Sequence, residues 1–158
     1  MVDATTQATM TAEEYFSLPE TLDRTDLIQG ELIVSPAPST NHQLLVGKLY
    51  RIIMSIIPDG DVLIAPTDVY LGNSYVVQPD IFWASAQGRC TQTPRYYQGA
   101  PDLVVEVLSP STALRDKSVK FDLYEQFGVR EYWLADYNAE LIEIYALNEG
   151  KFQRVGAY

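Results

Sequence analysis

The stretch LVVEV, residues Leu103–Val107, limits what this chain can fold into more than any other part of the sequence. Leucine and valine favour a buried strand, whereas glutamate is depleted from strand interiors. Successive side chains of a strand point to opposite faces, so the odd-numbered apolar residues share one face and Glu106 lies on the other. A buried carboxylate without a partner is costly. We therefore expect a strand at Leu103–Leu108, with the main core on its odd-numbered face and Glu106 directed away from that core.

A second carboxylate, Asp80, lies in another stretch that is typical of a strand, Tyr75–Trp83. Alternation places Asp80 on the same face as Val76 and Phe82. If this strand pairs with the one that contains Glu106, the two carboxylates converge. Neighbouring carboxylates repel each other unless a cation lies between them. Mg²⁺ fits such a pair because it takes oxygen ligands and retains several waters.

The helix expected at Ser111–Phe127 places positive charge after the strand of Glu106. Asp116, Lys120 and Tyr124 recur at every fourth position and share one helical face, and Lys117 lies close to Lys120 in the sequence. A lysine that faces a metal-bound water can orient it or stabilise a pentavalent phosphoryl transition state. Two simpler interpretations stay open: the lysines lie on a solvated helix face, and the Pro-Asp pairs are turn elements.

The remaining patterns predict a mixed α/β or α+β domain, with one central sheet flanked by helices, over residues 11–158. Two more helices are expected: a short one from a capping box at Thr11–Glu14 to a point before Pro19, and a long one capped by Ser39 that runs to Ile56. The further expected strands are Glu31–Ser35, Asp61–Ala65, Asp68–Leu71, Glu131–Ala135, Leu141–Leu147 and Lys151–Val155. Residues 84–100 are expected to form a loop, and the polar residues 1–10 to be disordered.

Composition narrows the class of protein. Among 158 residues there is one cysteine, Cys90, and one histidine, which argues against an intrachain disulfide and against a zinc site. The sequence has no apolar run of membrane-spanning length and no signal-peptide pattern, so we expect a cytoplasmic protein without a membrane partner. A net charge of −10, from 21 acidic and 11 basic residues, disfavours a general nucleic-acid binder. Arg115, Lys117 and Lys120 still form a local basic group.

Several blocks in order along the chain resemble one known family. These are GELIVSPAP (30–38), followed by His42, then QPDIFW (78–83), GAPDLVVEVLSPST (99–112) and RDKSVKFDLYEQFGVREYWLAD (115–136). Together they resemble the Uma-two family of restriction-endonuclease-like proteins, within the PD-(D/E)xK nuclease superfamily. The resemblance extends from about residue 12 to 155. It implies a restriction-endonuclease-like mixed sheet flanked by helices, a divalent-metal site and phosphodiester cleavage of DNA.

The resemblance also implies roles for particular residues. Asp80 matches the aspartate of the Pro-Asp motif and Glu106 the second acid, so both would hold Mg²⁺, or Mn²⁺ in its place. The superfamily lysine usually follows two residues after the second acid, where this chain has Leu108. The matching basic residue here is Lys120 on the next helix, and Lys117 is the other candidate. Glu31 is a further candidate metal ligand and equally a surface acid.

Three other polar residues receive structural interpretations from the sequence. His42 reads as a polar surface or packing residue, Asp102 as a turn and strand-start residue, and Asp116 as a residue that orients the helix start or pairs with a base. Family members continue past KFQRVGAY, so the chain reads as a short or truncated member. Its open last strand would then favour a homodimer.

The leading hypothesis is a Mg²⁺-dependent DNA endonuclease in which a metal-bound water attacks the phosphorus, assisted by Lys120. The alternative is a non-catalytic protein of the same fold that acts as a binding or regulatory partner, and the acidic charge favours it. Glycoside hydrolysis by the two carboxylates is a weaker third possibility. It requires a cleft lined by aromatic residues, and the tyrosines follow no such pattern.

Overall fold

The computed structural model describes residues 9–110 and 112–158, so most of the expected disordered segment 1–10 and the start of the helix expected at Ser111 lie outside the described residues. Met10 donates its backbone N–H to the carbonyl of Gly30 at 2.8 Å. The helices are α1 (Ala12–Phe16), α2 (Thr40–Ile56), α3 (Ala113–Lys117) and α4 (Val119–Phe127). The strands are β1 (Arg24–Ile28), β2 (Glu31–Ser35), β3 (Asp61–Ile64), β4 (Val69–Gly72), β5 (Tyr75–Val77), β6 (Ile81–Ala84), β7 (Thr91–Gln92), β8 (Tyr97–Gln98), β9 (Leu103–Val107), β10 (Glu131–Asp136), β11 (Leu141–Asn148) and β12 (Lys151–Ala157).

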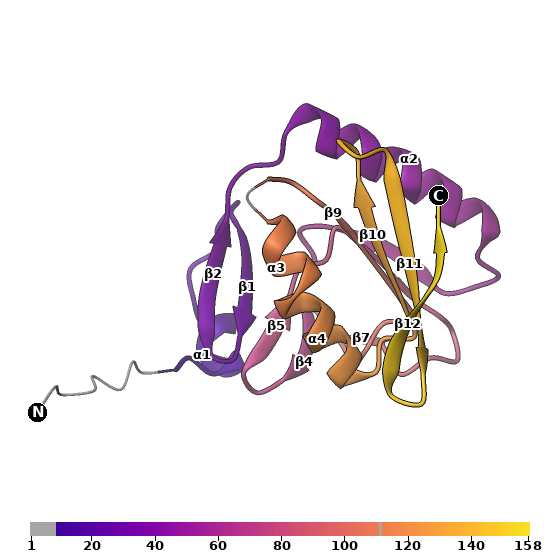
Figure 1. Cartoon of the computed structure of the whole chain (residues 1–158). Coiled ribbons are helices and arrows are strands. Elements are labelled where there is room, and N and C mark those ends of the chain that lie inside the picture. The colour runs from indigo at the N-terminus through magenta and orange to yellow at the C-terminus, as the bar shows by residue number, and fades with distance from the viewer. Residues whose placement is uncertain (1–8, 111) are drawn as a thin grey trace, which may run out of the picture.

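The strands form two six-stranded sheets where the sequence predicts a single central one. The first has the order β2-β1-β5-β4-β8-β7, and the second has the order β12-β11-β10-β9-β6-β3. The second sheet is mixed, because β9 and β10 run parallel whereas its other neighbours are antiparallel. In Figure 1 the α3–α4 segment crosses one side of this sheet and α2 passes behind it, with the β1–β2 hairpin beside α3.

The single strand predicted at Tyr75–Trp83 is divided into β5 and β6, which belong to different sheets. The division falls at Gln78-Pro79-Asp80. Proline has no N–H to donate to a ladder, so it interrupts a strand that would otherwise continue. Asp80 therefore stands where the chain passes from one sheet to the other, directly before the first residue of β6.

The prediction that Glu106 lies away from the main core is wrong, because both faces of β9 are buried. The odd-numbered face packs against α2 in a cluster that includes Leu49, Ile53 and Val105. The even-numbered face joins the larger cluster, with Val104 against residues of α4 and β10. Glu106 is only 1% exposed. A parallel central strand is commonly covered on both sides, so alternation alone does not identify its solvent side.

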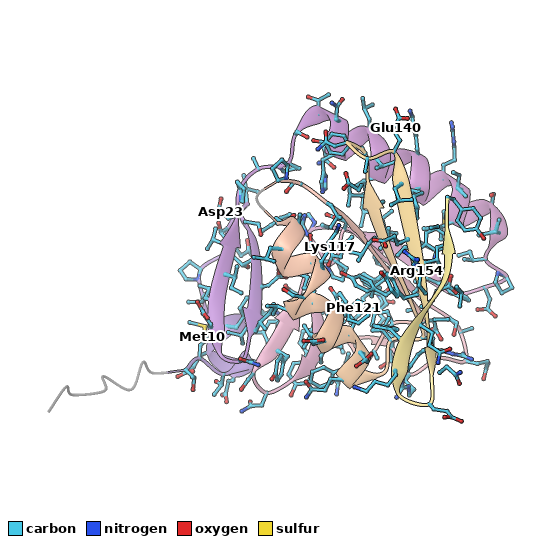
Figure 2. The ribbon with its side chains drawn as sticks, in the orientation of Figure 1. Met10, Asp23, Lys117, Phe121, Glu140 and Arg154 are labelled. Carbon is cyan, nitrogen blue, oxygen red and sulfur yellow. The ribbon has the colours of Figure 1, made fainter. Side chains whose placement is uncertain are left out.

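The single helix predicted at Ser111–Phe127 is interrupted at Ser118, whose φ of −123° and ψ of −71° are not helical. The break separates the two candidate lysines. Lys117 ends α3 and is exposed, whereas Lys120 in the first turn of α4 is 3% exposed. Figure 2 shows Lys117 near the junction of these helices and Phe121 beside the sheet. The predicted closure of the helix by Gly128 is confirmed, with φ at 82°.

Other elements follow the prediction with two exceptions. The capping box at Thr11 and the N-cap at Ser39 are both present. β1 is absent from the strands predicted from the sequence, although the two-residue Gln29-Gly30 connection, with φ of 53° and 77°, is typical of a tight hairpin. The loop expected at 84–100 contains the short strands β7 and β8.

Among the described residues, no helix has the length and apolar character that crossing a membrane requires.

Candidate active site

A cavity of about 210 Å³ lies where the ends of β1, β2 and β9 meet the first turns of α2 and α4. Asp23, labelled in Figure 2, marks the end of the β1–β2 hairpin that borders the cavity. The ionisable side chains that line the cavity are Arg24, His42, Asp80, Glu106, Asp116 and Lys120.

Asp80 is held in place through both of its carboxylate oxygens. Oδ1 lies 2.6 Å from Arg24 Nη1, and Oδ2 accepts the backbone N–H of Val107 at 2.7 Å and lies 3.3 Å from His42 Nε2. Burial alone would raise the pKa of Asp80, but the contacts with His42 and Arg24 outweigh it and hold that pKa below its usual range. Asp80 is therefore an ionised carboxylate in the interior.

Glu106 lies next to Asp80, as the pairing of β6 with β9 predicts. Its Oε1 accepts hydrogen bonds from Lys120 Nζ at 2.9 Å and from the Tyr124 hydroxyl at 2.8 Å. Its Oε2 accepts only a long hydrogen bond from the backbone N–H of Asp80, at 3.4 Å. Burial raises the pKa of Glu106 to about 8. The nearby charge of Lys120 lowers this pKa, whereas the charges of Asp116 and Asp80 raise it further.

Lys120 stands among three carboxylates. Its Nζ lies 2.9 Å from Glu106 Oε1, 3.2 Å from Asp26 Oδ2 and 3.7 Å from Asp116 Oδ1. Burial would lower the pKa of this amine, but the attraction of the carboxylates, Asp26 first, raises it. Lys120 is therefore a permanent cation. The pKa of Asp116 is raised, chiefly by burial.

The buried charges of the site do not balance. Four carboxyl groups, those of Asp26, Asp80, Glu106 and Asp116, are each 3% exposed or less. Their permanent cations are Arg24 and Lys120, so complete ionisation of the four carboxyl groups would leave two negative charges without a permanent partner. Buried charges without partners are unfavourable. Protons on carboxyl groups with raised pKa values, or a bound cation, would compensate them.

The donor set of this site fits Mg²⁺. Among the described residues, no three or more histidine, cysteine, aspartate or glutamate side chains converge in a way that would hold a metal by themselves. Mg²⁺ needs only one or two protein carboxylates, since waters and substrate phosphates complete its coordination. Asp80 and Glu106 supply carboxylate oxygens on neighbouring segments, and Glu106 Oε2 is weakly engaged. These two residues are the ones that would hold the ion.

The structure brings Asp80, Glu106 and Lys120 together and leaves Glu31 and Lys117 apart from them. Glu31 is exposed and pairs with Ile28 at the turn end of the β1–β2 hairpin, whereas the opposite end, at the Arg24–Ser35 pair, borders the cavity. The third carboxylate near this group is that of Asp26, which contacts Lys120 at 3.2 Å. Neither Glu31 nor Lys117 lines the cavity.

The structural interpretations of Asp102 and Asp116 agree with their contacts. Asp102 accepts the backbone N–H of Ser85 at 2.8 Å, directly before β9. Asp116 lies one helical turn before Lys120 and pairs with it.

Sequence reasoning missed three residues of the site: Arg24, Asp26 and His42. His42 is 6% exposed and contacts Asp80, although the sequence suggests a surface or packing residue. Arg24 and Asp26 belong to β1, the strand that was not predicted. Recognition of the Gln29-Gly30 hairpin would have placed them opposite Ser35 and Ile33. It would not have shown which residues of the second sheet they meet.

The fold and the site together define a restriction-endonuclease-like protein. The Uma2 family model, described as "Putative restriction endonuclease", matches residues 12–158, and the chain belongs to this family. The uncharacterized protein sll1609 of Synechocystis sp. is 33% identical over 151 residues, which cover 92% of this chain and 84% of that protein. The crystal structure of "a putative nuclease belonging to DUF820" from Anabaena variabilis has the same fold. Its TM-score is 0.74 at 21% identity, and the match covers 92% of this chain and 83% of that one.

Proposed function

We propose that this protein is a Mg²⁺-dependent DNA endonuclease. The observation that carries the proposal is the buried group of Asp80, Glu106 and Lys120 at one cavity, in which the two carboxylates adjoin and the lysine lies 2.9 Å from Glu106. Membership of the Uma2 family supports the same class of reaction. The excess of buried carboxylates explains why a divalent cation would be favoured here.

In this proposal Asp80 and Glu106 hold the ion, and Mn²⁺ takes its place when supplied. A bound Mg²⁺ lowers the pKa of a coordinated water and polarises the phosphate that is attacked. Lys120, fixed by Asp26, Glu106 and Asp116, supplies a permanent positive charge close to the phosphate. Such preorganised charge stabilises a transition state in which negative charge develops on phosphate oxygens.

The N-terminus of α2 faces the same cavity through Ser39 and His42. Backbone N–H groups at a helix N-terminus attract anions, and the first turn of α2 contains no acidic residue. A DNA phosphate that enters the cavity would meet this end of the helix and Arg24. These groups give an acidic chain a local surface that accepts a polyanion.

The test is cleavage of supercoiled plasmid with Mg²⁺, with Mn²⁺ and with EDTA. The variants are Asp80→Asn, Glu106→Gln and Lys120→Met, beside Lys117→Met as the matched lysine control. We expect metal-dependent nicking by the parent protein and the Lys117 variant, and a loss of at least about a hundredfold in the other three. Cleavage that persists in EDTA, or equally in the Asp80 and Glu106 variants, would contradict the proposal.

The rival function, a non-catalytic protein that binds or regulates a partner, is favoured by the net charge of −10, since a free nuclease must approach a polyanion. The two functions differ in what a metal does. The rival predicts no cleavage under any metal and no Mg²⁺ binding at Asp80. A folded parent protein that fails both assays would establish the rival.

We also propose that the protein is a homodimer, because two sites are needed to cut two strands. The open edges of the second sheet are β12 and β3; Val155 of β12 is exposed, and so is Tyr158, which follows the strand. A bulge between Ile144 and Tyr145 of β11 disturbs the pairing with β12. Light scattering after size exclusion would give twice the chain mass of 17.8 kDa for the dimer.

A further inference from the structure

We propose that Arg24 is a placeholder cation: it neutralises Asp80 when no metal is bound, and it passes to a DNA phosphate when Mg²⁺ takes Asp80. The inference rests on the proposed function, because it assigns a role within the same site. This role of Arg24 predicts that Mg²⁺ binding and DNA binding are coupled, because the Arg24 side chain that Mg²⁺ displaces from Asp80 then contacts the phosphate backbone.

The contact between Arg24 and Asp80 joins the two sheets. Arg24 is the first residue of β1, and its guanidinium reaches the segment before β6, where Nη1 lies 2.6 Å from Asp80 Oδ1 and Nη2 donates to the Gln78 carbonyl at 2.7 Å. The side chain of Arg24 is 19% exposed and that of Asp80 is 3% exposed. The guanidinium therefore lies between a buried carboxylate and the cavity that it lines.

Arg24 and a metal ion would compete for the same oxygen. Asp80 Oδ2 already accepts the Val107 N–H and contacts His42, so Oδ1 is the oxygen that remains for a metal. Oδ1 is also the atom that Arg24 contacts. Binding of Mg²⁺ at Asp80 must therefore weaken or displace the Arg24 contact, and the released guanidinium stays at the cavity.

The donors of Arg24 are incompletely used in the present arrangement. Its buried Nε has no hydrogen-bond partner among the described residues. A guanidinium presents five N–H donors in a planar fork that matches the oxygens of a phosphate. A phosphate that replaces Asp80 as the partner of Arg24 would accept two parallel hydrogen bonds, as guanidinium–phosphate pairs commonly do.

Arg24 is not needed to hold the segment before β6 against β1, because other bonds do so. The backbone N–H of Thr25 donates to Gln78 Oε1 at 3.0 Å, and the backbone N–H of Gln78 donates to Asp26 Oδ1 at 2.8 Å. A purely structural role for Arg24 would repeat this connection. Among the residues that the structure describes, Arg24 is the one that places a positive charge against Asp80 Oδ1.

The first measurement is the Mg²⁺ affinity of Arg24→Gln, by isothermal titration calorimetry, beside the parent protein and Arg51→Gln. Arg51 is exposed on α2 and lies outside the cavity, so its variant controls for the loss of one positive charge. Because the competing charge-assisted contact is removed, we expect Arg24→Gln to bind Mg²⁺ about tenfold more tightly. The Arg51 variant should bind like the parent.

The second measurement is binding of a short fluorescent DNA duplex in Ca²⁺, followed by anisotropy. Ca²⁺ takes the same oxygen ligands as Mg²⁺. We expect Arg24→Gln to bind the duplex at least about tenfold more weakly than Arg51→Gln, although it binds metal more tightly. Tighter Mg²⁺ binding together with weaker DNA binding is the result expected of a side chain that leaves a metal-binding carboxylate and contacts a phosphate instead.

Arg24→Lys provides a second variant if Arg24→Gln does not fold. Lysine keeps the charge but lacks the fork that bridges Asp80 and the Gln78 carbonyl, so Mg²⁺ should again bind more tightly and DNA more weakly. Parent-like or weaker Mg²⁺ affinity in a folded variant, while the parent binds Mg²⁺, would overturn the role of Arg24 alone. Absence of Mg²⁺ binding in the parent and in every variant would overturn the proposed nuclease as well.

Discussion

Lys120 is the residue on which three buried carboxylates converge, and its removal should destabilise the fold as well as the site. In Lys120→Met, the carboxyl groups of Asp26, Glu106 and Asp116 lose their shared cation. Removal of one partner from a buried ion pair costs about 3–5 kcal/mol. We expect a loss of that size in the free energy of unfolding at pH 7, measured with urea.

Lys117→Met provides the matched control, because Lys117 is exposed and only three positions away in the sequence. Exposed substitutions of this kind usually change the free energy of unfolding by less than about 0.5 kcal/mol. Similar urea midpoints for the two methionine variants would show that Lys120 does not compensate the buried carboxylates.

Glu106 should make the metal-free protein less stable as the pH rises. Burial raises its pKa to about 8, so between its ordinary value of 4.5 and that value the folded state retains a proton that the unfolded state has lost. The stabilisation from this proton is complete below the ordinary pKa and is lost as the pH rises through about 8. Glu106→Gln carries no such proton. Its stability relative to the parent should therefore increase between pH 6 and pH 9, measured with urea in EDTA.

A parent protein that gains stability relative to Glu106→Gln over that range would contradict this assignment. The result would mean that Lys120 holds Glu106 ionised throughout, and that the excess charge is compensated elsewhere. Asp116, whose pKa is also raised, would then be the group that retains the proton.

At the scale of elements, α4 depends on its C-terminal glycine. Gly128 has φ of 82°, and an added Cβ would lie 2.7 Å from Arg89 Nη2. We expect Gly128→Ala to reduce the free energy of unfolding by about 1–2 kcal/mol, because an L-residue is strained in this conformation. The matched control is Gly47→Ala in α2, where an added Cβ meets nothing within 4 Å and alanine should stabilise the helix by about 1 kcal/mol. Thermal unfolding of both variants checks the opposite signs.

The ends of the helices show what the sequence could and could not predict. Gly128 was recognisable as a helix end because it follows a helical pattern, and the capping residues Thr11 and Ser39 were recognisable for similar local reasons. The break at Ser118 was not recognisable, since serine is compatible with a continuous helix. The break separates the exposed Lys117 from Lys120, which is buried in the site.

The same distinction holds for the candidate site. Asp80, Glu106 and Lys120 follow motifs along the chain, so a resemblance could locate them. Arg24 and Asp26 reach the site only because the first sheet packs against the second. Arg24 contacts Asp80, which lies 56 positions further along the chain, and Asp26 contacts Lys120. Side-chain contacts between sheets depend on tertiary packing, which hydrophobic periodicity in a single strand does not report.

For the molecule as a whole, binding of Mg²⁺ at the site should appear as thermal stabilisation. An ion that binds only the folded state at a hundred times its dissociation constant adds about 2.7 kcal/mol to the free energy of unfolding. For a chain of this size each kcal/mol raises the melting temperature by about 2–4 °C. We therefore expect an increase of about 5–10 °C in saturating Mg²⁺, measured by differential scanning calorimetry.

The acidic surface requires a control, since any salt screens a net charge of −10. NaCl at the same ionic strength should screen the net charge to the same extent. It should not produce the part of the increase in melting temperature that comes from Mg²⁺ binding. Asp80→Asn should respond to MgCl₂ only as it responds to NaCl, because it lacks the carboxylate that would hold the ion. A parent protein that responds identically to both salts would have no Mg²⁺ site in the folded state. The buried carboxylates would then be compensated by protons, and the non-catalytic function would be the better explanation of this fold.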